Sequence, residues 1–268
     1  MNVGYTTIMY DSESVATTGI SDFAACRYDG VEIGLEKVEA LGADTLGSLL
    51  DEYDIDLFCV MAGWLNTEED RQRAVDGAAL AGDLGSTFLG ILPPPRGVVD
   101  DETFAEWLED ICEAAAEAGV TPVVHHHFGA HVEQPEEIRY WLDEGPDNLE
   151  LLFDTAHYYP YGESVGEGIE RFADDIAYVH LKDIDPPAEF EYHIQNLTEG
   201  KKDYDSIINC VWAFTDLGRG VIDFGEAVAT LDDVDYDGYL TIEIENERNH
   251  PLVHAKENMD HLRSVTDR

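Results

Sequence analysis

Short runs of apolar and β-branched residues alternate along the chain with longer stretches in which apolar residues recur every three or four positions. Eight of the short runs are strand candidates, at residues 2–9, 30–34, 56–63, 87–93, 121–127, 149–157, 177–184 and 238–245. The stretches between them, such as 67–85 and 101–119, have helical spacing and a glycine near the C-terminal end. Repeated strand–helix units in 268 residues predict the α/β class and a single (β/α)8 TIM barrel, with one domain over residues 1–268.

The other common α/β arrangement, an open sheet that binds a dinucleotide, is disfavoured by the sequence. No Gly-x-Gly-x-x-Gly turn follows the first predicted strand. One long stretch without a clear period, about 185–222, follows the seventh strand. Because the segments after barrel strands build the catalytic face, we expect this irregular stretch to lie over that face.

Ionisable residues in the strands share the parity that faces the barrel interior. In residues 177–184, Val179 and Leu181 take one parity, and His180 and Lys182 take the other. Corresponding positions in the other strands hold Glu32, His125, His127, Asp154, Glu243 and Glu245. His157, the last residue of the run at 149–157, is expected just past the end of the strand itself. His126 would point outward or sideways. Barrel active sites form at the carboxyl ends of strands, so these residues are site candidates.

Four of these candidates form a ligand set for a divalent metal. His125, Asp154, His180 and Glu243 come from successive strand ends and offer two imidazoles and two carboxylates. This mixed set predicts Mn²⁺ or Co²⁺, with Zn²⁺, Fe²⁺ and Mg²⁺ as alternatives. A cation would also offset the cost of burying these charges. The other interpretation is an interior of hydrogen-bonded histidines and acids without metal.

Composition indicates a folded protein with a strongly acidic surface. Fifteen Lys and Arg against 58 Asp and Glu give a formal charge of −43, while 44% of the residues are hydrophobic. Such a surface repels phosphates, which predicts no nucleic-acid partner, and it suits a cytoplasm of high salt. The four cysteines have no pairing pattern, and neither a leader-like start nor a membrane-length apolar run is present. We therefore expect a cytoplasmic, halophilic protein without a membrane partner.

Several motifs resemble one family of barrel enzymes. GVEIG, VVHHHFGAHVEQPEEI, LLFDTAHYYPYG, YVHLKDI, FTDLGRGVIDF and YLTIEIEN occur in this order and resemble the xylose-isomerase-like superfamily of sugar isomerases, epimerases and dehydratases. The HHHFG run is the most specific of them and resembles the inosose dehydratases. The superfamily holds its metal with Glu, Asp, His and Glu, which fall here on His125, Asp154, His180 and Glu243. A histidine at the first position argues against an epimerase that uses two metal-bound glutamates as bases.

The resemblance implies a metal-dependent lyase that removes water from a keto-inositol or related keto-polyol through an enediolate. It makes Glu243 or His127 the base, and Lys182 or His157 the acid. The candidates for substrate binding are Glu32, Trp64, His127 and Arg219, with Lys201 and Lys202 as weaker ones. Lys182 stands out because the chain has only five lysines; its alternative is an ion pair with Asp183 or Asp154.

Other functions remain open from the sequence. The same fold and metal could serve a keto-sugar isomerase or epimerase, and a barrel that binds a sugar or metal without turnover is a second alternative. A nuclease of the same superfamily is disfavoured by the acidic surface. The resemblance also implies a homodimer or homotetramer. His131, His193, His250, His254 and His261 are expected to be surface or helix residues.

Overall fold

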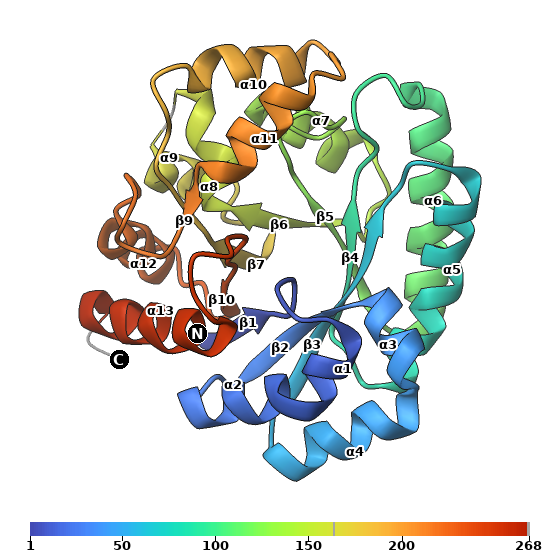
Figure 1. Cartoon of the computed structure of the whole chain (residues 1–268). Coiled ribbons are helices and arrows are strands. Elements are labelled where there is room, and N and C mark those ends of the chain that lie inside the picture. The colour runs from blue at the N-terminus through green and yellow to red at the C-terminus, as the bar shows by residue number, and fades with distance from the viewer. Residues whose placement is uncertain (163, 267–268) are drawn as a thin grey trace.

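The computed structural model describes residues 1–162 and 164–266, and within them eight parallel strands close into a barrel (Figure 1). The strands are β1 (Asn2–Thr6), β2 (Gly30–Gly34), β3 (Asp56–Trp64), β4 (Phe88–Leu92), β5 (Thr121–His125), β6 (Glu150–Asp154), β7 (Ile176–Leu181) and β10 (Tyr239–Ile242). Their order around the ring is β1-β10-β7-β6-β5-β4-β3-β2. The predicted TIM barrel is confirmed.

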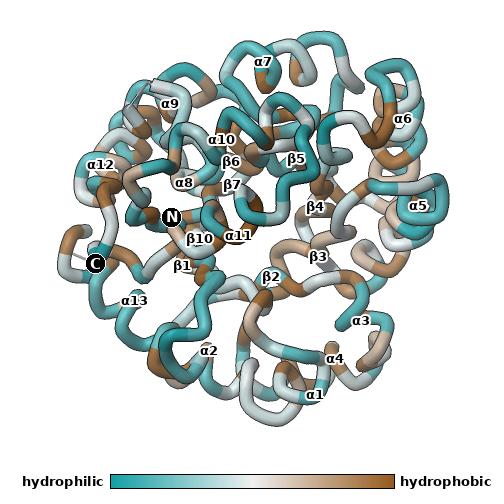
Figure 2. The backbone as a smooth tube through the Cα atoms, turned by 45° about the horizontal axis from the view of Figure 1, so that its top comes forward, coloured by the Kyte–Doolittle hydropathy of each residue, from teal (hydrophilic) through white to brown (hydrophobic). Residues whose placement is uncertain are grey.

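Helices surround the barrel and connect successive strands (Figure 1). They are α1 (Ser12–Ser14), the π-helix η1 (Val15–Gly19), α2 (Ile20–Cys26), α3 (Leu35–Leu41), α4 (Ala43–Tyr53), α5 (Glu68–Asp83), α6 (Asp101–Ala118), α7 (Pro135–Glu144), α8 (Thr155–Tyr158), the 3-10 helix η2 (Tyr159–Tyr161), α9 (Val165–Arg171), α10 (Phe190–Thr198), α11 (Tyr204–Trp212), α12 (Phe224–Asp233) and α13 (Pro251–Thr266). Figure 2 shows long hydrophilic stretches along α5 and α13.

Helix α6 shows how local sequence sets these boundaries. The Asp100 side chain accepts a hydrogen bond from the Thr103 N–H and caps the first turn. At the other end Gly119 has a φ of 75°, a left-handed conformation that glycine adopts without strain. Phe104, Leu108 and Ile111 lie on the buried face between the caps. The predicted helix at 101–119 therefore forms almost as expected.

Apolar residues fill two separate regions, one outside the strands and one inside the barrel. Val179 and Leu181 belong to the large cluster between strands and helices. Tyr178 belongs to the small second cluster and contacts Phe58 of β3 and Phe88 of β4 across the barrel. The alternation predicted for β7 therefore places its odd positions outward and its even positions inward.

The expectation of an irregular stretch at 185–222 is wrong. This segment contains α10 and α11, followed by the short strand β9 (Phe214–Thr215), which pairs antiparallel with β8 (Asp183–Ile184). Phe190 and Ile194 form the buried side of α10, a helical pattern too short to stand out in the sequence. Since β8 directly follows Lys182, the segment returns over the carboxyl ends of the strands, the face predicted for it (Figure 1).

The observed strands are shorter than several of the predicted runs. β6 ends at Asp154 and β10 ends at Ile242, so His157 and Glu243 lie on the segments that follow. Within the described part of the chain, none of the helices combines the length and apolar character needed to cross a bilayer.

Candidate active site and metal centre

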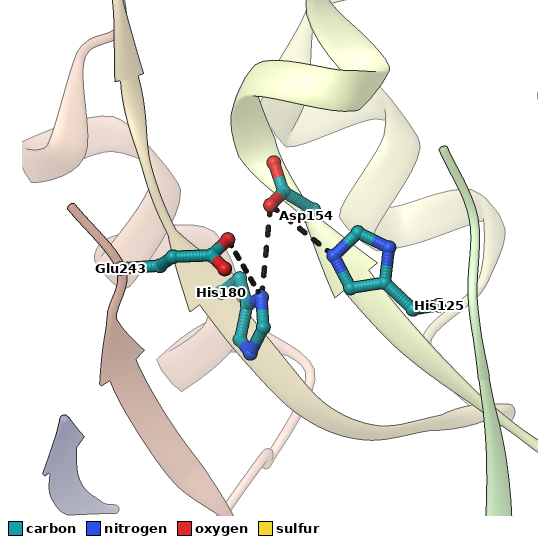
Figure 3. A group of neighbouring side chains, drawn as sticks. All are labelled: His125, Asp154, His180 and Glu243. Atoms are coloured by element: carbon teal, nitrogen blue, oxygen red, sulfur yellow. Dashed lines mark ion pairs between the residues drawn. The ribbon is translucent and has the colours of Figure 1, made fainter. Parts of the chain in front are cut away.

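Four buried side chains converge at the carboxyl ends of adjacent strands. His125 ends β5, Asp154 ends β6, His180 lies near the end of β7, and Glu243 follows β10. These strands are neighbours in the ring, so the four side chains turn toward one point (Figure 3). Each offers one ligand atom, and these atoms all lie within 4.8 Å of one another. We call these four residues the ligand cluster.

The contacts inside the ligand cluster leave polar atoms without hydrogen-bond partners. Asp154 Oδ2 lies 3.5 Å from His125 Nε2 and 3.7 Å from His180 Nδ1, and Glu243 Oε2 lies 3.1 Å from His180 Nδ1. Among the described residues, Asp154 Oδ2, Glu243 Oε2 and His180 Nδ1 are buried without a hydrogen-bond partner. Buried polar atoms in native proteins are nearly always paired, so these facing atoms need a common partner.

The opposite atoms of the Asp154 and His180 side chains form hydrogen bonds. Asp154 Oδ1 accepts hydrogen bonds from the backbone N–H groups of Ala156 and His157 at 2.8 and 2.9 Å. His180 Nε2 lies 2.9 Å from Glu32 Oε2, which also accepts the Tyr178 hydroxyl at 2.7 Å. A proton on Nε2 directs the Nδ1 lone pair into the cluster, as in the carboxylate–histidine pairs of metal sites.

The ligand cluster carries excess negative charge. Burial lowers the pKa of His180, but the charges of Glu32 and Glu243 outweigh burial and hold the pKa well above its usual value. A cation would compensate the same charge. Two imidazole nitrogens and two carboxylate oxygens fit Mn²⁺, Co²⁺, Zn²⁺ or Fe²⁺. The cluster could therefore bind a divalent metal.

His126 holds the backbone of Asp154, a role that the sequence did not indicate. It points away from the cavity, and its Nε2 accepts the Asp154 backbone N–H at 2.9 Å. Burial, followed by the charge of His125, lowers the pKa of His126 to about 3, so the imidazole remains neutral and able to accept. It thereby fixes the backbone of Asp154.

Lys182 points into the barrel beside the ligand cluster. Its Nζ lies 3.1 Å from Glu243 and 2.6 Å from Glu245, and 4.0 Å from the centre of the Phe214 ring. Burial lowers the pKa of Lys182, but the two glutamates outweigh burial and raise it above its usual value. The ammonium therefore stays protonated and can donate hydrogen bonds.

The acids paired with Lys182 differ from the two considered in the sequence. Asp183 instead accepts backbone N–H groups of Gly218 and Gly220 at 2.8 and 2.9 Å. Lys182 pairs with Glu245, an inward-facing acid to which the sequence assigned no role. Burial and Glu243 raise the pKa of Glu245 despite Lys182, while Lys182 and His180 overcome burial and lower that of Glu243 to about 2.

Two neutral histidines lie beside these charges. The rings of His127 and His157 have centroids 3.7 Å apart, and Trp64 packs edge-on against His127. His127 Nδ1 lies 2.8 Å from the Phe128 carbonyl oxygen, so Nδ1 carries the proton and Nε2 keeps its lone pair. Burial and then His125 lower the pKa of His127 to about 3, and burial likewise keeps the pKa of His157 well below its usual value.

These residues line a cavity of about 240 Å³. Eight of the predicted site residues line it: Glu32, Trp64, His125, His127, His157, His180, Lys182 and Glu243. Asp154 lies beneath the surface of the cavity, with no exposed area. The walls also include Glu245, and Thr7, Glu36 and Lys37, which the sequence did not indicate.

The prediction for Arg219 finds no support in the fold. Its side chain is 54% exposed, pairs with Glu257 at 2.7 Å and does not line the cavity. The glycines around it serve a close backbone path, because a Cβ on Gly220 would stand 2.2 Å from the Ile184 carbonyl oxygen. Lys201 pairs with Glu199, and Lys201 and Lys202 line a neighbouring cavity that shares Trp64 and His127.

Two histidines expected at the surface or on helices are buried on helices. His193 of α10 lies 3.1 Å from the Ser206 hydroxyl oxygen, and His254 of α13 contacts Asp216 at 2.6 Å. Both contacts join helices to neighbouring segments, so these side chains hold the fold together away from the cavity.

A family model described as a xylose isomerase-like TIM barrel matches residues 20–265. The chain belongs to this family. Among the relatives of this xylose isomerase-like barrel are curated inosose dehydratases. The Clostridium perfringens protein is 34% identical over 197 residues, which cover 69% of this chain and 64% of that protein. The Histophilus somni protein is 30% identical over 274 residues, which cover 92% of this chain and 88% of that protein. The match to the first thus spans less than two thirds of its length.

Solved structures of the same shape include a probable 3-DHS dehydratase from Bacillus anthracis, with a TM-score of 0.74 and 14% identity over 98% of both chains. A D-allulose 3-epimerase from Methylomonas sp. has a TM-score of 0.73 and 17% identity, covering 99% of this chain and 97% of that one. At such identities these likenesses show a shared fold.

Proposed function

We propose that this enzyme is a divalent-metal-dependent dehydratase that removes water from a keto-inositol or a related keto-polyol. The observation that carries the proposal is one cavity that joins the ligand cluster, a protonated lysine and neutral histidines. The inosose dehydratases among its relatives support the substrate class. His125 in place of a carboxylate supports dehydration over a reaction with two glutamate bases.

Dehydration next to a ketone needs one base and one acid. The base takes the proton from the carbon beside the carbonyl, and the C–H electrons form an enolate. The β C–O bond then breaks, and the departing hydroxyl receives a proton from the acid and leaves as water. A divalent cation in the ligand cluster would stabilise the negative charge that develops on the ketone oxygen.

The residues of the cavity divide between these roles by their protonation. Of the two candidate bases, His127 keeps a lone pair on Nε2, whereas the Glu243 carboxylate belongs to the ligand cluster and lies 3.1 Å from Lys182 Nζ. Of the two candidate acids, Lys182 carries the proton throughout the neutral pH range. We assign the base to His127 and the acid to Lys182, with Glu32 orienting His180.

The test is incubation with Mn²⁺ and 2-keto-myo-inositol, beside a panel of ketoses, in about 2 M KCl to screen the acidic surface. Loss of one water from the keto-inositol, abolished by chelator, is the expected result. Asp154→Asn should lower turnover by about a hundredfold or more because it weakens the ligand cluster. Asp110→Asn, at a half-exposed acid paired with Arg71, is the matched control and should leave turnover unchanged.

Other outcomes separate the remaining functions. A new isomer of unchanged mass would replace dehydration by isomerisation or epimerisation at the same cluster. Binding of sugar or metal without any product would contradict the enzymatic proposal.

A further inference from the structure

The side of the cavity opposite the ligand cluster presents another pair of charged residues. Around the ring, β2 lies four strands from β6 in either direction, so the segment after β2 faces Asp154 across the barrel mouth. Helix α3 begins there, and Glu36 and Lys37 of its first turn line the cavity. A substrate bound at the ligand cluster would extend its far side toward these two residues.

Lys37 keeps hydrogen-bonding capacity that the protein does not use. Its side chain is only 13% exposed, and Nζ donates to the Thr7 carbonyl oxygen at 3.0 Å. Glu36 Oε1 stands 3.6 Å away, beyond hydrogen-bond distance. An ammonium has three N–H donors, and in the described residues Thr7 supplies its one hydrogen-bonded acceptor. The remaining donors border the cavity.

Glu36 completes the pair from the other side. Its carboxylate folds back over Gly34, where an added Cβ would lie 2.5 Å from Oε1. The side chain is 55% exposed and remains free to accept hydrogen bonds. An ammonium that donates and a carboxylate that accepts, side by side, match the hydroxyl groups of a polyol.

Comparison with two other lysines of the chain argues against a role of Lys37 in surface solubility alone. Lys201 and Lys256 are more than half exposed, and each forms a close ion pair with a neighbouring acid. Lys37, by contrast, is largely removed from water at a cavity wall, with a carbonyl as its main partner. Burying an ammonium with so few partners costs free energy that a bound ligand would return.

We propose that Lys37, assisted by Glu36, binds the hydroxyl groups of the substrate that lie farthest from the ketone. The inference rests on the proposed keto-polyol substrate. It makes this pair the determinant that favours a fully hydroxylated polyol over a substrate lacking distal hydroxyls.

The experiment compares kcat and KM for 2-keto-myo-inositol in the wild type, Lys37→Met, Lys37→Arg and the control Lys256→Met. Lys37→Met should raise KM by about 10- to 100-fold, the effect of losing a hydrogen bond to a charged group, with little change in kcat. Lys37→Arg should recover part of the loss, and Lys256→Met should match the wild type. With a keto-inositol lacking one distal hydroxyl, the penalty of Lys37→Met should shrink.

An unchanged KM in Lys37→Met would overturn the proposal. A lower melting temperature and a lower kcat with an unchanged KM would also overturn it, because this result would mean that the contact between Lys37 and Thr7 only stabilises the fold. If the wild type turns over no keto-polyol, the proposed function is wrong, whatever the role of Lys37. Calorimetric titration of the wild type and Lys37→Met with myo-inositol then tests whether Lys37 binds polyol hydroxyl groups. Weaker binding by Lys37→Met then supports the proposal, and equal or absent binding by both proteins overturns it.

Discussion

Three buried histidines surround the ligand cluster without carrying charge. Burial is the largest cause that lowers the pKa values of His126, His127 and His157, and the neighbouring imidazoles and Lys182 lower them further. Their neutrality gives His126 its acceptor role and His127 its free lone pair. It also makes the folded state sensitive to acid, because unfolding releases imidazoles that protonate near pH 6.5.

The sign of this effect follows from the proton balance. Between about pH 6.5 and 5 these three histidines bind protons in the unfolded chain but not in the folded one, so their contribution to stability falls as pH falls. Each histidine contributes a slope of up to about 1.4 kcal/mol per pH unit. Urea unfolding of the chelator-treated protein in about 2 M KCl, at pH 7, 6 and 5, measures it.

A pair of variants assigns the slope to the site. His157→Asn should remove one histidine's share, whereas His250→Asn, at an exposed position, should leave the slope as it is. Equal slopes in the wild type and in His157→Asn would contradict the neutral state of His157 in the folded protein.

At the scale of elements, the buried Glu133 carboxylate connects α10 to the loops that surround the carboxyl ends of the strands. Glu133 accepts hydrogen bonds from Arg96 Nε, the Tyr161 hydroxyl and the Thr198 hydroxyl, each at 2.6 Å. These residues lie after β4, in η2 and at the end of α10, and Glu133 itself lies after β5. One side chain therefore ties α10 to the loops around the catalytic face.

Removing this carboxylate should be costly. Glu133→Ala removes the acceptor of Arg96 Nε and of the Tyr161 and Thr198 hydroxyls, while Arg96 keeps its contact with Glu137. It should lower the free energy of unfolding by about 3–5 kcal/mol. The control Glu136→Gln disrupts an exposed pair with Arg171 and should cost less than about 1 kcal/mol. Urea unfolding compares the two variants, and equal losses would show that Glu133 does not hold α10.

At the scale of the whole molecule, the charge of −43 dominates the surface. Most cations are already used in local ion pairs, such as Arg73 with Glu39 and Arg139 with Asp175. The uncompensated carboxylates repel one another, and this repulsion opposes the compact state at low ionic strength. Salt shortens its range from about 10 Å at 0.1 M to about 3 Å at 1 M.

We therefore expect the melting temperature to rise by about 10 °C or more between 0.1 and 2 M KCl, which corresponds to a few kcal/mol. Scanning calorimetry measures the shift. Sucrose, which strengthens burial without screening charge, provides the control and should stabilise the protein much less. Equal melting temperatures in both salt solutions would contradict adaptation to a high-salt cytoplasm.

The barrel and much of the site could be predicted from the order of residues alone. Alternation within a strand is a local property, so Val179 and Leu181 indicated the outward face and thereby placed His180 and Lys182 inside. The bounds of helix α6 could also be predicted locally, because the capping Asp100 and the terminating Gly119 stand directly before its first turn and after its last one. Strand ends of a closed barrel must meet, which is why His125, Asp154 and their partners could be grouped before their distances were known.

The pairing of side chains across the molecule, by contrast, depends on the folded arrangement. Lys182 reaches Glu245 rather than Asp183, Arg219 turns outward to Glu257, and Lys37 borders the cavity from α3. The helices α10 and α11 are too short for a clear periodic signal, and contacts such as Thr198 with Glu133 hold them. Such pairings depend on the closure of the barrel and the course of its loops, which bring together residues far apart in the chain and leave no local pattern.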